Sequence, residues 1–141
     1  MKRWLNSLVL GLVAMLGVAQ AQAYELPKPK VIAVFFSADW CPACKQLAPV
    51  LEEARKVGEF DKKDILFVKL DLTDKATIHQ SILLASALGI APFVQKQGSS
   101  TGYVALLAAD KTTELARFDR TATAADIVAG VEKQLAAGAG K

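Results

Sequence analysis

The sequence predicts one α/β domain with a central mixed sheet and helices on both faces. The apolar run Val31–Phe36, an amphipathic stretch after it and a second apolar run at Ile65–Leu72 indicate a βαβ unit with parallel strands. Two later strand patterns, Tyr103–Ala109 and Glu114–Asp119, flank a short turn and predict an antiparallel hairpin. With 141 residues, 52% of them apolar and 22% charged, the chain has material for one hydrophobic core.

The βαβ unit follows from hydrophobic periodicity. Val31–Phe36 is continuous, β-branched and aromatic, as expected of a strand that is buried on both faces. From about Pro42 to Val57 apolar residues recur with helical spacing, which indicates a helix with one buried face, and Gly58 ends it. Apolar residues alternate along Ile65–Leu72, so we expect the second strand there.

The second half of the chain contains two further helical patterns. Thr73 or Asp74 can cap a helix over about 75–88. We expect Ile90–Gly102, which is rich in Gly, Ser and Gln, to be a long loop before the hairpin. A capping-box pattern after the hairpin opens a last helix, over about Thr123–Ala137.

The N-terminus has the pattern of a secretory signal peptide. Two basic residues precede the apolar segment Leu8–Val18, and Ala21-Gln22-Ala23 is a small-residue cleavage pattern. Because the apolar segment is shorter than the roughly 20 residues that span a bilayer, we expect cleavage rather than an uncleaved anchor. We therefore expect residues 1–23 to be a signal peptide and residues 24–141 to form the domain. The predicted location is the periplasm, without membrane insertion after cleavage.

Charge and cysteine content limit the classes of function that the chain can have. The net charge of +3 is spread along the chain without a basic run, which argues against a nucleic-acid-binding protein. The chain has two cysteines, Cys41 and Cys44, separated by Pro42-Ala43. A single closely spaced pair in an exported protein, where disulfides persist, directs attention to thiol chemistry.

The Cys-Pro-Ala-Cys motif is placed at the end of a buried strand and in the first turn of a helix. Residues three apart on a helix are neighbours, so this pair can close and open a disulfide with little backbone movement. Unpaired amides and the positive dipole at the helix start stabilise a thiolate at Cys41, which makes it the expected attacking thiol. Cys44, one turn further, is expected to be more buried and to resolve. Pro42 suits the first helical position because its missing N–H would have had no partner.

Other uses of the two cysteines are weaker, and some are excluded. A structural staple that closes only four residues stabilises by about 2 kcal/mol. Structural zinc needs four ligands, and haem attachment needs a histidine where Lys45 stands, so we expect no metal centre of these kinds. Two alternatives remain: a copper carrier that holds Cu(I) between the cysteines, and a non-catalytic interaction module with a permanently closed disulfide. After cleavage the chain lacks Met, and its one His, His79, is expected at the surface, which disfavours the carrier.

The segment Phe36–Lys45, followed by Pro49, resembles the active-site segment of the thioredoxin superfamily, and the similarity extends over Val31–Ala137. The resemblance implies a thioredoxin-like fold and an activity that needs no dissociable cofactor. It implies that Cys41 is the attacking thiolate and Cys44 the resolving thiol.

The resemblance also implies roles for neighbouring residues. Trp40 is expected to pack beside the cysteine pair, and Lys69 corresponds to a lysine near the buried end of the site. Thioredoxins proper have an aspartate at the position of Phe35, thought to relay protons to the resolving thiol, so that relay is absent here.

A second departure concerns the family's cis-proline, which immediately precedes the hairpin strand and packs against the disulfide. That position falls at Gly102 or Tyr103, whereas the nearby proline is Pro92. Two explanations stay open: either Ile90–Gly102 folds Ala91-Pro92 back to the site, or the loop Ser99–Gly102 replaces the proline.

These observations predict a periplasmic thiol–disulfide oxidoreductase that exchanges disulfides with protein substrates through Cys41 and Cys44. The absence of an acidic relay and of a histidine between the cysteines favours a reductase, because a strong oxidant needs a more stabilised thiolate. Electrons would come from, or go to, a membrane or periplasmic redox partner. We expect a monomer.

Overall fold

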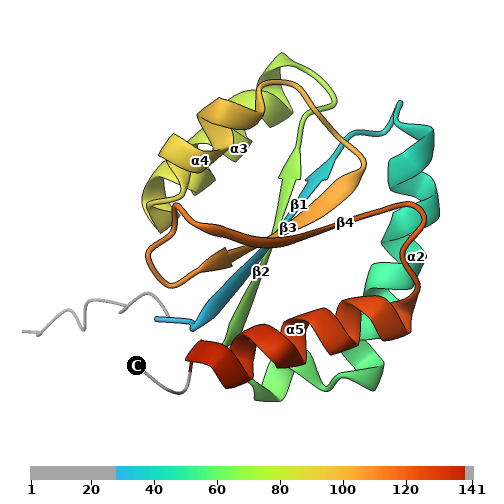
Figure 1. Ribbon diagram of the computed structural model, residues 1–141. Helices are drawn as coiled ribbons and strands as arrows, with labels where there is room; N and C mark the ends of the chain where they lie inside the picture. Colours follow the sequence, from blue (N-terminus) through green and yellow to red (C-terminus); the bar gives the residue numbers. More distant parts are fainter. Residues whose placement is uncertain (1–27, 139–141) are drawn as a thin grey trace, which may run out of the picture.

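In the described part of the chain, four strands form one mixed sheet in the order β2-β1-β3-β4 (Figure 1). β1 (Val31–Ser37) pairs in parallel with β2 (Ile65–Asp71) and antiparallel with β3 (Tyr103–Ala108), which pairs antiparallel with β4 (Glu114–Asp119). The computed structural model describes residues 28–138, so the predicted signal segment lies outside the described residues. The βαβ unit, the hairpin and the fold class are confirmed.

Helices cover both faces of the sheet, as predicted (Figure 1). α2 (Pro42–Val57) and α5 (Ala124–Gly138) pack on one face, and α3 (Lys75–Leu88) and α4 (Ala91–Gln97) pack on the other. A short 3-10 helix, η1 (Phe60–Lys62), follows α2. Within residues 28–138, no helix combines the length and apolarity needed to cross a bilayer.

β1 lies at the centre of the core, and every one of its residues is buried. Alternate side chains point to opposite faces of a strand, so Ala33 and Phe35 join the cluster under α2 while Val34 and Phe36 join the cluster under α3 and α4. The continuous apolar run follows from this position, because both faces of β1 are covered by helices.

α3 begins and ends at the residues that the sequence indicated. The carboxylate of Asp74 accepts hydrogen bonds from the backbone N–H groups of Ala76 and Thr77, which satisfies two donors of the first turn. Gly89 ends the helix in the left-handed conformation, with a φ of 75°.

The expectation of a long loop over Ile90–Gly102 is wrong, because α4 occupies most of it. Pro92 lies in the first turn, where a missing N–H costs nothing. Phe93 is buried, and its ring centroid lies 6.3 Å from that of Phe36. This burial supplies tertiary stabilisation that a seven-residue helix lacks on its own.

Candidate active site

Cys41 and Cys44 form a disulfide at the start of α2, with their Cα atoms 5.3 Å apart. Cys41 is the N-cap residue of α2 and has extended backbone geometry, whereas Cys44 lies in the first helical turn after Pro42. The backbone N–H of Cys44 donates a hydrogen bond to the Sγ of Cys41, at 3.1 Å. The sulfur of Cys41 therefore occupies the position that a serine or aspartate oxygen takes in an ordinary helix cap.

This placement has a direct chemical consequence for the reduced protein. An unpaired N–H and the positive end of the helix dipole both lower the energy of an anion at the N-cap. Neighbouring charges contribute less, because Asp39 and Lys45 are exposed to water. The helix start is thus the main source of thiolate stabilisation at Cys41.

Burial does not distinguish the two cysteines, contrary to the expectation that Cys44 is the more buried. Cys41 is 4% exposed and Cys44 is 3% exposed. The Sγ of Cys44 lies 3.8 Å from the backbone oxygen of Phe36, so a protonated Cys44 has an acceptor for its S–H. That contact favours the neutral thiol at Cys44, whereas the amide contact favours the thiolate at Cys41.

Trp40 lies next to the disulfide in sequence but is not packed into the core. Trp40 is 59% exposed, and its indole N–H donates a hydrogen bond to the backbone oxygen of Thr73 at 3.1 Å. The N–H of Asp39 donates to the Oγ1 of the same Thr73, at 3.0 Å. The segment before Cys41 is therefore connected by two hydrogen bonds to the loop between β2 and α3, and the indole ring is exposed to solvent.

Gly102, and not Pro92, lies against the disulfide. Pro92 is exposed in the first turn of α4, and residues 28–138 contain no cis peptide bond. Gly102 has a φ of 88° and donates its N–H to the backbone oxygen of Phe36 at 2.8 Å. A Cβ placed on Gly102 would lie 3.4 Å from the Sγ of Cys41 and 2.8 Å from the Cβ of Ala43. Of the two explanations, the structure supports the one in which the loop Ser99–Gly102 replaces the proline.

Phe35 and Lys69 face each other in the parallel register of β1 and β2. Phe35 is buried in the same cluster as Cys44, so an apolar ring and not a carboxylate lies at this position of β1. Lys69 is exposed and lies at the margin of the sheet rather than at a buried end of the site. Proton transfer to or from Cys44 therefore has no carboxylate at this position.

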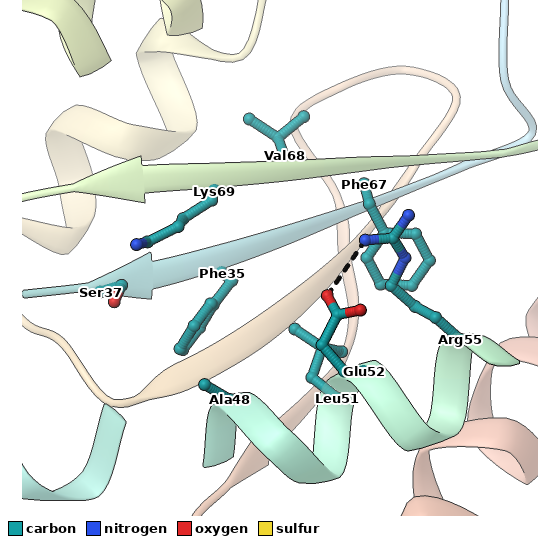
Figure 2. A pocket seen from close by; sticks show the side chains of 9 residues that line it. All are labelled: Phe35, Ser37, Ala48, Leu51, Glu52, Arg55, Phe67, Val68 and Lys69. Atoms are coloured by element: carbon teal, nitrogen blue, oxygen red, sulfur yellow. Dashed lines mark hydrogen bonds and ion pairs between the residues drawn. The ribbon is translucent and has the colours of Figure 1, made fainter. Parts of the chain in front are cut away.

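A hollow of about 380 Å³ opens between α2 and the β1–β2 edge of the sheet (Figure 2). Phe35 and Lys69 point into it from the strands, and Glu52 and Arg55 line it from α2. No sequence pattern predicted this hollow. The available signal for its charged side was the i, i+3 spacing of Glu52 and Arg55, because opposite charges at that spacing on a helix form ion pairs. In the structure the guanidinium of Arg55 lies 3.2 Å from the carboxylate of Glu52.

The structure gives two results on possible metal ligands. Among residues 28–138, no three residues of the types His, Cys, Asp and Glu are grouped as metal ligands would be. His79 is exposed on α3, as expected.

Comparison with known proteins relates the disulfide segment to one family. The sequence model of the thioredoxin family matches residues 20–86. The chain is 37% identical over 51 residues to thioredoxin H-type of Brassica oleracea, which is 36% of this chain and 38% of that protein. It is 46% identical over 43 residues to thioredoxin of Mycoplasmoides gallisepticum, which is 30% of this chain and 39% of that protein.

The fold is similar to that of one solved structure. The solution structure of a candidate protein disulfide isomerase from Bacteroides thetaiotaomicron matches with a TM-score of 0.52 and 17% identity. The match covers 76% of this chain and 74% of that chain, and it concerns the fold alone. The chain spans less than two fifths of the length of the two curated relatives named above.

Proposed function

The chain contains a thioredoxin-family domain, and from this premise we propose that it is a periplasmic thiol–disulfide oxidoreductase that reduces disulfides in other proteins. One observation carries the proposal. The Sγ of Cys41 caps α2 and accepts the N–H of Cys44, so the reduced protein holds a nucleophilic thiolate at the helix start.

The first step is an attack by the Cys41 thiolate on one sulfur of a substrate disulfide. A bond forms between Cys41 and that sulfur, and the substrate's own S–S bond breaks. The other substrate sulfur leaves as a thiolate and takes a proton from water. Trp40, the residue before Cys41 in the sequence, exposes an apolar indole surface on which a substrate chain can rest.

In the second step Cys44 resolves the mixed disulfide. Its thiol gives a proton to water and attacks the Sγ of Cys41. The Cys41–Cys44 bond forms, the bond between Cys41 and the substrate breaks, and that substrate sulfur leaves as a thiolate and takes a proton from water. Two electrons have then passed from the dithiol to the substrate. Because Phe35 supplies no carboxylate to accept the Cys44 proton, we expect this step to be slower than in thioredoxins that have an aspartate there.

The direction of exchange rests on the redox potential. We propose reduction because one amide and the helix dipole stabilise the Cys41 thiolate, and no histidine or arginine adds to them at the motif. A strong oxidant needs its reduced form stabilised further. A second protein dithiol, at the membrane or in the periplasm, must return the electrons after each cycle. The proposed location rests on the signal-peptide pattern of residues 1–23.

Trapping of substrates in the native host tests the mechanism. In Cys44→Ala the mixed disulfide on Cys41 cannot be resolved, so covalent adducts should accumulate and be identifiable by mass spectrometry. The matched control is Cys41→Ala, which should trap nothing. The proposal fails if both variants give the same adducts, or if neither gives any.

Equilibration in glutathione buffers tests direction and separates the remaining alternatives. We expect a midpoint closer to the thioredoxin value of about −270 mV than to the DsbA value of about −120 mV. A disulfide that never equilibrates would support the non-catalytic interaction module. Cu(I) bound tightly by the wild-type dithiol, together with no adducts from Cys44→Ala, would support the copper carrier.

A further inference from the structure

We propose that the free edge of β2 binds an extended peptide segment of another protein, added to the sheet as an antiparallel strand. The segment pairs with Phe67 and Lys69 and carries an acidic residue opposite Lys69. This site is separate from the Cys41–Cys44 disulfide and needs no thiol chemistry.

Among residues 28–138, β2 is an outer strand of the sheet and has a neighbouring strand, β1, on one side only. The N–H of Leu72 donates to the backbone oxygen of Ser37 at 2.7 Å, and the N–H of Val31 donates to that of Asp64 at 3.2 Å. In a parallel pair this pattern directs the backbone groups of the even-numbered β2 residues toward β1. The odd-numbered residues, 65, 67, 69 and 71, direct theirs away from the sheet.

Both ends of this edge are closed by other parts of the chain. The Oγ of Ser81 accepts the N–H of Asp71 at 2.8 Å and donates to its backbone oxygen at 2.9 Å. The N–H of Ile65 donates to the backbone oxygen of Lys63, at 2.8 Å. In the part of the chain that the structure describes, the outward N–H and C=O groups of Phe67 and Lys69 have no partner. An unpaired stretch of this kind is a template for strand addition.

The hollow between α2 and the sheet lies at the same stretch of edge (Figure 2). Phe67 and Lys69 both have their side chains on the α2 side, where they line it. Residues directly opposite each other in antiparallel strands have their side chains on the same face. The peptide residues opposite Phe67 and Lys69 would therefore extend over this hollow, and the intervening residue would point to the other face.

The charges at the hollow select the peptide's side chains. Arg55 is neutralised by Glu52 and Asp61, each 3.2 Å from its guanidinium. Lys69 makes no ion pair with any residue between 28 and 138. Asp71, two residues further along β2, has its carboxylate held by Thr73. The charge of Lys69 acts on Asp71 without forming an ion pair with it, so a carboxylate opposite Lys69 would be its first direct partner among the described residues.

The partly buried ring of Phe67 selects the next contact. It stacks on Phe60 with ring centroids 5.5 Å apart, and the guanidinium of Arg55 lies 5.0 Å from its centroid. A peptide residue opposite Phe67 adds to this stack if it is apolar or aromatic. Because the added strand is antiparallel, that residue is two positions after the acid, so the recognised pattern is an acid, any residue and an apolar residue.

Hydrogen exchange measured by NMR tests the site directly. The probe is a cysteine-free peptide of about eight residues, the length of a strand, with valine and threonine around a Glu-Thr-Leu centre. In the free protein the amides of Phe67 and Lys69 should exchange fast, whereas those of Val68 and Leu70, which bond to β1, should be protected. Saturating peptide should slow exchange at Phe67 and Lys69 and leave Val68 and Leu70 unchanged.

A charge swap tests the acid. Lys69→Glu should weaken binding of the Glu peptide and strengthen binding of the same peptide with Lys in place of Glu, each by up to about fivefold, the range of one cross-strand charge pair. Lys56→Glu, an exposed lysine on α2, is the matched control and should change neither affinity. Lys69→Gln should bind both peptides alike.

Three results would overturn the proposal. The first is no slowing at Phe67 and Lys69 with saturating peptide. The second is affinity that does not follow the charge at position 69. The third is slow exchange of the Phe67 and Lys69 amides in the full chain without peptide. If this protection does not depend on protein concentration, residues 1–27 cover the edge. If it increases with protein concentration, a second copy of the chain covers it.

Discussion

Replacement of Gly102 by alanine tests the unusual backbone beside the disulfide. The new Cβ would lie 2.8 Å from the Cβ of Ala43, closer than real carbon atoms approach, and 3.4 Å from the Sγ of Cys41. Gly102 also has a φ of 88°, which L-residues rarely adopt. The substitution therefore combines backbone strain with overpacking.

The expected loss of stability is the sum of these two costs. Left-handed backbone costs a non-glycine residue roughly 1–2 kcal/mol, and overpacking costs typically 1–3 kcal/mol. We expect the free energy of unfolding of oxidised Gly102→Ala to fall by about 2–5 kcal/mol, as measured by urea denaturation followed by circular dichroism.

Gly89→Ala separates the two costs. Gly89 has a φ of 75°, and its Cβ would meet only the flexible end of Lys111, at 3.2 Å. It should lose about 1–2 kcal/mol, from strain alone. The double variant Gly102→Ala with Ala43→Gly lacks the Ala43 methyl that clashes with the new Cβ. It should recover part of the stability that Gly102→Ala loses. Equal losses for the Gly102 and Gly89 variants, without recovery in the double variant, would refute this interpretation of the contact.

Three further predictions concern the rest of the domain. Ser81→Ala should lower the free energy of unfolding by about 1–3 kcal/mol in urea, because it leaves the N–H and C=O of Asp71 without their partner; a change below 0.5 kcal/mol would contradict this. Hydrogen bonds from Thr113 lower the pKa of Asp110 from 3.8 to about 2, so its stabilisation is complete above pH 4 and is lost as the pH falls toward 2. Asp110→Asn should therefore lose less stability than wild type over that range, and equal losses would contradict the shift. The fluorescence of Trp40 should differ between dithiothreitol and oxidised glutathione, and Trp40→Phe should abolish the difference; unchanged emission would show that the indole does not sense the pair.

The βαβ unit was predictable because its residues carry strong and mutually consistent signals. β1 is apolar throughout since helices cover both of its faces, and α2 begins at a proline and ends before a glycine. These signals depend on local backbone geometry, which neighbouring residues determine. The place of Cys41 at the helix N-terminus follows from the same signals.

α4 was not predictable in the same way, because its stabilisation is tertiary. Ile90, the residue before α4, provides no side-chain cap. Gly89 and Gly98 lie on either side, and such glycines are typical of a loop. The burial of Phe93 against the face of the sheet opposite α2 and α5 stabilises this helix. The available signal for a helix here was a proline at its start, Pro92, followed by two apolar residues, with a glycine directly after Gln97.

The surroundings of the disulfide also depend on contacts between distant segments. The approach of Gly102 to Cys41 brings together two residues that are far apart in the sequence, so sequence alone left two explanations open. The exposure of Lys69 follows from the position of β2 at the edge of the sheet, which is a property of strand order. No local pattern at Lys69 contains that information.

The pH dependence of alkylation at a single sulfur tests the proposed chemistry most directly. In Cys44→Ala, the rate at which iodoacetamide modifies Cys41 should follow a titration centred below the value of about 8.5 found for free cysteine, because the N-terminus of α2 stabilises the anion. A titration at or above the free value would show that the helix start gives this sulfur no advantage as a nucleophile.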